Sequence, residues 1–233
     1  MSDKTQQTYV VAGRQRWNRR VFDETIRHYP GEWHFVGTPE EMTVERMQRL
    51  RPRYIFFLHW SNIVSQELLE AFESVCFHMT DLPFGRGGSP LQNLIMRGHR
   101  RTQITALRMT SELDAGPVYF KETLCLAESA EEIYIRATQI SAGMIERIIR
   151  DNPQPTLQSG AVVAFKRRKP SDSEIPETAS LYELYDFVRM LDADGYPRAF
   201  LSHGGCRYEF GRAALKDGRV IADVTITREK EQA

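Results

Sequence analysis

Short apolar runs alternate with segments of helical periodicity through the first two thirds of the chain, and this alternation most constrains the fold. We expect strands at residues 8–12, 32–36, 54–60 and 75–78. A capping box, Thr38-Pro39-Glu40-Glu41, carries Pro at the first helical position and predicts a helix start, and a further helix is expected at 66–72. Short buried strands alternating with helices are typical of a parallel, doubly wound sheet. The chain is therefore predicted to be an α/β protein.

The remaining sequence extends this pattern and then departs from it. Further strands are expected at 102–109 and 118–126, and a capping box at Ser129 begins a helix with an apolar stripe of Ile133, Ala137, Ile140, Met144 and Ile148. A boundary follows the basic run 166–170, after which Ser180 caps one more helix and the tail from Ala199 alternates as short strands. We predict a main domain at 1–165 and a small C-terminal α+β accessory region at 166–233.

Composition excludes several classes of protein. The 233 residues carry 31 Lys and Arg against 31 Asp and Glu, so no overall polyanion-binding surface is indicated. The three cysteines, at unrelated spacings, form neither a disulfide framework nor a metal-ligand cluster, and we expect no metal. The N-terminus lacks a signal-peptide pattern, and no apolar run approaches the length of a membrane span. A cytoplasmic protein without a membrane partner is expected, and a homodimer is compatible with the sequence.

Two turns carry the candidate chemistry. The apolar run from Val75 to Phe77 ends at His78, where a Gly- and Pro-rich loop begins, and Asp114 opens the turn Asp-Ala-Gly-Pro. Ligands of open α/β sheets bind outside the carboxyl ends of the strands, where His78 is expected to lie. A histidine facing a carboxylate can move protons near neutral pH. The alternative is structural, with Asp114 capping a turn and His78 filling a pocket.

The stretch from His78 to Pro90 resembles the formyltransferase pattern His-Pro-Ser-Leu-Leu-Pro, two spacer residues, Arg-Gly, two more residues, Pro. Two further segments, 102–105 and 113–117, are similar to the next two signatures of that family, in the same order. The resemblance implies a Rossmann-like, doubly wound, mostly parallel sheet (the formyltransferase fold). It also implies that the chain transfers a formyl group from N10-formyltetrahydrofolate to an amine. One position departs from the family pattern, because Cys76 stands where the family has a catalytic Asn.

The resemblance assigns His78 and Asp114 as the catalytic pair. The Asn of the family donates an amide N–H to the developing oxyanion, and a thiol is a poor donor, so Asn62 becomes a candidate substitute. Asn62 is equally interpretable as a loop residue or a helix-entry cap. Cys76 as a nucleophile is not expected, because no basic neighbour at a suitable spacing would activate it. The residues assigned to the folate by resemblance are Trp60, Asn62, Ile63, Val64, Leu113 and Asp114.

Three arginines are candidate substrate contacts. Arg14 and Arg16 follow the first strand and can meet a phosphate at a helix N-terminus, although a solvated basic face is the commoner role. Arg86 lies in the loop after His78, where a structural salt bridge is slightly favoured over an active-site role.

The acceptor is predicted to be a nucleotide-linked amino sugar, a precursor of cell-surface glycans. Residues 171–233 hold eight Lys and Arg against twelve Asp and Glu, which is the wrong sign for nucleic acid, and 185–200 resembles the tail of the short sugar N-formyltransferases. Alternatives remain: another amine such as an aminoacyl substrate, hydrolysis of the formyl-folate, or folate or nucleotide-sugar binding without turnover because of Cys76.

Overall fold

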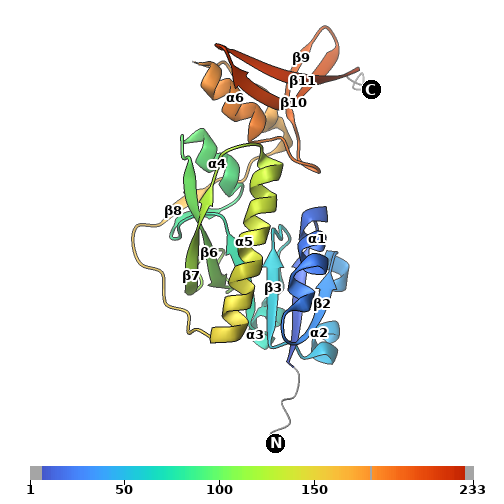
Figure 1. Cartoon of the computed structure of the whole chain (residues 1–233), viewed down its shortest axis with the longest axis vertical. Helices are drawn as coiled ribbons and strands as arrows, with labels where there is room; N and C mark the ends of the chain where they lie inside the picture. Colours follow the sequence, from blue (N-terminus) through green and yellow to red (C-terminus); the bar gives the residue numbers. More distant parts are fainter. Residues whose placement is uncertain (1–6, 179, 229–233) are drawn as a thin grey trace, which may run out of the picture. The chain divides into compact units, whose positions relative to one another are not determined.

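A computed structural model describes residues 7–178 and 180–228. Its central sheet has the strand order β2-β1-β3-β4-β6-β7 (Figure 1). The strands are β1 (Thr8–Gly13), β2 (Glu32–Val36), β3 (Tyr54–Leu58), β4 (Ser74–His78), β6 (Arg101–Arg108) and β7 (Val118–Cys125). β1 pairs in parallel with β2 and β3, β3 pairs in parallel with β4, and β6 runs antiparallel to β4. The predicted α/β class with a mostly parallel, doubly wound sheet is confirmed.

The strand order reverses beside β1, which locates the switch point of the sheet. The chain moves outward from β1 to β2 and then returns to add β3 on the other side of β1. Gly13 at the end of β1 lies opposite Leu58 at the end of β3, and Phe57 of β3 lies opposite Cys76 of β4. The carboxyl ends of β1, β3 and β4 therefore lie side by side, at the edge where doubly wound sheets bind ligands.

Helices follow the strands much as their capping signals predict. They are α1 (Arg16–Glu24), α2 (Val44–Leu50), α3 (Gln66–Ala71) and α5 (Ala130–Asp151), with 3-10 turns η1 (Ile26–His28) and η2 (Pro39–Glu41). At the start of α5, Ser129 N–H donates to Glu132 Oε2 at 2.9 Å, as its capping box predicts. The box at Thr38 forms too, but it heads only η2, and Thr43 caps the α-helix that follows.

The core explains why the sheet is a rigid platform. All five residues of β3, and Val10 to Ala12 of β1, are buried, because both faces of the sheet are covered. Burial of a large apolar side chain contributes roughly 1.5–3 kcal/mol. One cluster that does so contains Val10, Ala12, Val36, Met47, Ile55, Phe57 and Leu68. The predicted stripe of α5 is buried at Ile133, Ala137, Met144 and Ile148, and Ile140 is partly exposed.

The chain divides into two compact units. The first comprises the described residues up to Gly87 with Gln103–Leu124 and Ile135–Ala164, and the second comprises Gly88–Thr102, Cys125–Tyr134 and the described residues from Phe165 on. The second contains α4 (Pro90–Met96), η3 (Pro170–Ser173), α6 (Leu181–Arg189) and an antiparallel sheet ordered β11-β10-β9. The strands of that sheet are β9 (Ala199–His203), β10 (Cys206–Lys216) and β11 (Arg219–Arg228). A small sheet pairs β5 (Phe84–Gly87) with β8 (Val163–Phe165).

In the described part of the chain, every helix is too short or too polar to cross a bilayer.

Candidate active site

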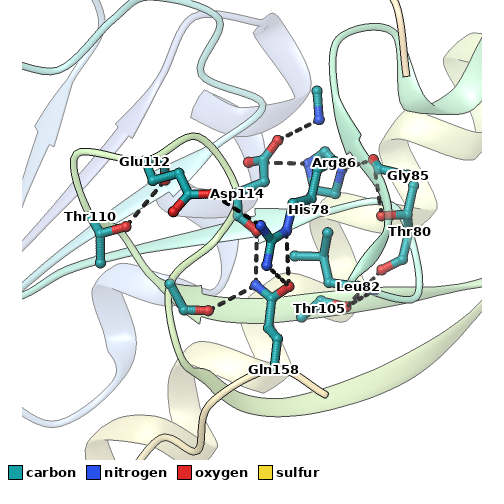
Figure 2. Close-up of polar contacts among 12 residues, drawn as sticks. His78, Thr80, Leu82, Gly85, Arg86, Thr105, Thr110, Glu112, Asp114 and Gln158 are labelled. Atoms are coloured by element: carbon teal, nitrogen blue, oxygen red, sulfur yellow. Dashed lines mark hydrogen bonds and ion pairs between the residues drawn. The ribbon is translucent and has the colours of Figure 1, made fainter. Parts of the chain in front are cut away.

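His78 is the last residue of β4, and its imidazole is held from both sides (Figure 2). The Nε2 atom lies 2.8 Å from the carbonyl oxygen of Gly85, which can only accept, so Nε2 carries a proton. The Nδ1 atom lies 3.5 Å from Asp114 Oδ1, and the two side chains are 10% and 11% exposed. A proton arriving at Nδ1 would therefore lie beside a carboxylate in a site that is largely closed to solvent.

Asp114 occupies a strained turn between β6 and β7. Its backbone φ of 53° is left-handed, a conformation that Asp tolerates better than most residues. Its Oδ2 accepts a hydrogen bond of 2.9 Å from the N–H of Gly87, which leaves Oδ1 toward His78. Glycine is required two positions later, because a Cβ at Gly116 would lie 1.8 Å from the carbonyl oxygen of Arg108. The Asp-Ala-Gly-Pro sequence thus forms the turn that carries the carboxylate to the histidine.

Cys76 precedes His78 by two residues on β4, so both side chains lie on one face of the strand. Burial raises the pKa of the Cys76 thiol, and the negative charge of Asp114 raises that pKa further. The thiol therefore stays protonated near neutral pH, which supports the prediction that it is not a nucleophile. Because it shares a strand face with His78, Cys76 lies next to the same site.

The Arg86 guanidinium hydrogen-bonds to other residues of the protein. Its Nε and Nη2 donate to Gln158 Oε1 at 3.2 and 2.9 Å, and its Nη1 donates to Glu112 Oε1 at 3.2 Å. The Arg86 side chain is only 17% exposed. This geometry favours the structural role of Arg86 over the substrate contact.

Arg14 and Asn62 meet at the switch point. Arg14 follows β1 and Asn62 follows β3, and Arg14 Nη1 donates to Asn62 Oδ1 at 3.2 Å. Both are exposed, as is Arg16 at the start of α1. The N-cap of α1, Gln15, makes no capping hydrogen bond through its side chain. Their role in binding, and that of Asn62 as an oxyanion donor, stay predictions.

β3 is shorter than predicted. It ends at Leu58 because His59 adopts a left-handed φ of 48°, which terminates the ladder before Trp60. Burial lowers the pKa of His59 to about 4, so its neutral ring accepts a hydrogen bond from Trp17 Nε1.

The residues assigned to the folate by resemblance lie on two loops. Trp60 and Val64 pack partly buried against the core, whereas Ile63 is 100% and Leu113 71% exposed. Exposed large apolar side chains are a feature that a planar ligand can cover. Their contact with folate stays a prediction.

Three groups at the site could not be predicted from the sequence. The carbonyl of Gly85 and the N–H of Gly87 are backbone groups, which leave no residue-type signal. Gln158 lies in an irregular segment 44 residues after Asp114, without a periodic pattern to place it.

Among residues 7–178 and 180–228, His, Cys, Asp and Glu side chains form no group of three or more that could hold a metal ion. That no metal takes part stays a prediction.

Comparison with known proteins identifies the family. Residues 11–148 match the family model described as "Formyl transferase", and residues 170–227 match the one described as "Methionyl-tRNA formyltransferase, C-terminal domain". The chain belongs to the formyl transferase family, as the motifs predict.

Individual relatives differ in what they share with the chain. A methionyl-tRNA formyltransferase from Clostridium thermocellum has a TM-score of 0.91 and is 42% identical, covering 96% of this chain and 100% of that one. Methionyl-tRNA formyltransferase of Rickettsia massiliae is 29% identical over 179 residues, 72% of this chain and 58% of the relative. The chain thus spans 58% of the length of that curated relative. A 4-N formyltransferase from Francisella tularensis is 12% identical with a TM-score of 0.64 over 97% of this chain and 98% of that one, a likeness of fold alone.

Proposed function

We propose that the chain is an enzyme that transfers a formyl group from N10-formyltetrahydrofolate to a primary amine, with His78 and Asp114 as the catalytic pair. The observation that carries this proposal is the placement of His78 Nδ1 3.5 Å from Asp114 Oδ1, at the carboxyl end of a central strand. Family membership supplies the reaction class and the formyl-folate donor.

The reaction requires one new bond and two proton movements. The amine nitrogen attacks the formyl carbon, a C–N bond forms, and the bond from the formyl carbon to folate N10 breaks. The amine loses a proton and N10 gains one, so the transfer consumes no net acid or base. His78 would receive and deliver the proton at Nδ1, while the Asp114 carboxylate stabilises the imidazolium formed in between. The carbonyl of Gly85 holds the ring in position throughout.

Donor binding is assigned to the loops at residues 60–64 and 113–114. In the proposal, backbone groups of the first loop hydrogen-bond the pteridine ring, and the side chains of Ile63, Val64 and Leu113 contact its faces. Ile63 and Leu113 are exposed and available to a ligand, which supports this assignment.

Two acceptor classes each have an observation in their favour. The 42% identity to the Clostridium thermocellum protein, named a methionyl-tRNA formyltransferase, favours an aminoacyl amine carried on tRNA. The excess of acidic residues at 171–233 opposes phosphate contacts and favours the predicted nucleotide-linked amino sugar, with Arg14 and Arg16 meeting the diphosphate. The first acceptor makes nucleic acid a partner, and the second needs only a small molecule.

Reactions with a panel of acceptors distinguish the two acceptor classes. The protein is mixed with N10-formyltetrahydrofolate and, in turn, methionyl-tRNA, nucleotide-linked amino sugars and the corresponding free amino sugars, and formylated products are measured by mass spectrometry. If the nucleotide sugar is the acceptor, its free sugar reacts poorly. Arg14→Ala should then raise KM more than it lowers kcat, as loss of uniform binding does. Formylation of methionyl-tRNA alone would reject the sugar acceptor.

Cys76→Ser is expected to retain most of the wild-type turnover, because neither a thiol nor a hydroxyl is the main oxyanion donor in this proposal. Cys76→Asn introduces the residue that the family pattern has here. An oxyanion donor is typically worth about 10²–10³ in rate, so a gain in kcat for Cys76→Asn would show that the departure costs activity. A formyl-thioester on the wild-type protein, seen in the intact mass after mixing with the donor alone, would contradict this account of Cys76.

We further propose domains at 1–165 and 166–233 and a cytoplasmic location. In this proposal the reaction needs no metal and no membrane partner, and the homodimer remains compatible with it.

A further inference from the structure

The side-chain amide of Gln158 makes all the hydrogen bonds that it can form, and its partners lie in two other parts of the site (Figure 2). Its Nε2 donates to the carbonyl oxygens of Asp114 and Gly116, each at 2.8 Å. Its Oε1 accepts from Nε and Nη2 of Arg86, at 3.2 and 2.9 Å. A primary amide has two donor hydrogens and two acceptor lone pairs, and all four are satisfied here.

The backbone next to Gln158 pairs with the residues that follow the Asp114 turn. Thr156 and Val118 exchange backbone hydrogen bonds, 2.7 Å from Val118 N–H to Thr156 O and 2.8 Å in the reverse direction. Gln158 follows this antiparallel bridge by two residues and Gly116 precedes it by two, and the Gln158 side chain reaches the Gly116 carbonyl oxygen at 2.8 Å. Gln158 is partly buried, although its neighbours Leu157 and Ser159 are exposed. The amide is therefore directed inward by the register of the segment and not by burial of the segment as a whole.

The Asp114 turn needs such support. Asp114 has a left-handed backbone, which costs a residue other than Gly free energy and persists where the surrounding structure holds it. Gln158 holds the carbonyl of that residue and the carbonyl two positions later, and Arg86 fixes the orientation of the Gln158 amide. From the other side, the N–H of Gly87, next to Arg86, holds the Asp114 carboxylate. The loop after His78 and the turn of Asp114 are thus joined through Gln158.

We infer that Gln158, oriented by Arg86, is a positioning residue that fixes the Asp114 carboxylate beside His78 for formyl transfer. This inference rests on the proposed function and adds a residue that touches neither substrate nor the imidazole. Misplacement of a catalytic group by about 1 Å can cost roughly 10²-fold in rate.

The test compares Gln158→Leu and Gln158→Glu with the matched control Gln154→Leu, an exposed glutamine of the same segment. Leucine removes all four hydrogen bonds. Glutamate keeps the contact with Arg86 but turns one carboxylate oxygen, in place of the donor Nε2, toward the two carbonyls. Two quantities are measured on the full chain: deuterium uptake of peptides covering residues 109–117, and kcat and KM for the donor with the acceptor found in the panel.

We expect both Gln158 variants to take up deuterium faster at 109–117 and to lose about ten- to hundredfold in kcat. Donor KM should rise by a smaller factor, because Leu113 of the same turn is assigned to the donor. The control should match the wild type. In an Asp114→Asn background, Gln158→Leu should add little further loss, because both changes act through the same carboxylate.

Uptake and kcat that match the wild type in both variants would overturn the inference, as would faster uptake with unchanged kcat. Additive losses with Asp114→Asn would do so too. Failure of the proposed function has a different signature, since the wild type would then show no acceptor-dependent formyl transfer, and the uptake data would still decide whether Gln158 holds the turn.

Discussion

His78→Ala is expected to lower kcat by about 10²–10⁴-fold, the range that a positioned acid–base group contributes. The loss should fall on kcat, because the imidazole serves the proton transfers and not the binding of the donor. The ring contacts Gly85 and Asp114 and is not part of the apolar core, so the fold should survive. Steady-state kinetics with the accepted amine, together with the thermal unfolding midpoint, provide the measurement.

A matched control is His28→Ala, which removes an exposed imidazole on η1, away from the site. It should have the turnover of the wild type. Near-normal kcat in a folded His78→Ala protein would remove His78 from the mechanism.

Asp114→Asn is expected to reduce kcat by roughly 10²-fold or more, the lower end of the effect of an acid–base group. The amide keeps the size of the carboxylate and can still accept the hydrogen bond from Gly87, but it has no negative charge to stabilise an imidazolium at 3.5 Å. The loss is therefore electrostatic and should appear without a fall in stability.

Asp217→Asn is the control for this variant. Asp217 also has a left-handed backbone, with φ of 51°, and is exposed between β10 and β11, so the substitution makes the same chemical change in a similar turn conformation. It should leave kcat unchanged. If Asp114→Asn matched the wild type at every pH, the pairing with His78 would be wrong.

The strands were predictable because their signal is local and continuous. β1, β2 and β4 begin and end within a residue of the expected bounds, since β1 and β4 each contain an apolar run and β2 is bounded by Gly31 and Gly37. Among the predicted strands of the central sheet, β3 is the exception, because nothing in the apolar run 54–60 indicates that His59 will take a left-handed conformation. β5 and β8 lie outside the predicted strands. The capping box at Thr38 has a similar limit. It predicts that a helix starts there, but it cannot predict that only the short 3-10 turn η2 forms and ends at Glu41.

The proximity of His78 and Asp114 could be predicted from the sequence, but the groups that hold them could not. His78 was predicted from its position at the end of a strand, and Asp114 from its turn, and the structure brings the two together. The groups that hold them are backbone atoms of Gly85 and Gly87 and the side chain of Gln158. Backbone groups are present at every residue, and the place of Gln158 depends on the pairing of Thr156 with Val118. Neither leaves a pattern in the sequence.

The identity of the acceptor could not be predicted from the sequence either. Arg14 and Asn62 meet at the switch point, and their exposed side chains are compatible with either acceptor. Charge at the C-terminal region and overall similarity point in opposite directions, so the panel of acceptors has to decide between them.

In the proposed function, this chain moves a formyl group from N10-formyltetrahydrofolate to an amine at His78 and Asp114. The most direct measurement uses a donor labelled with ¹³C in the formyl group and follows tetrahydrofolate release and labelled product in the same reaction. We expect one labelled formamide for each tetrahydrofolate formed, in the wild type and, far more slowly, in His78→Ala. Release of labelled formate without formamide, or no consumption of the donor with any amine of the panel, would contradict it.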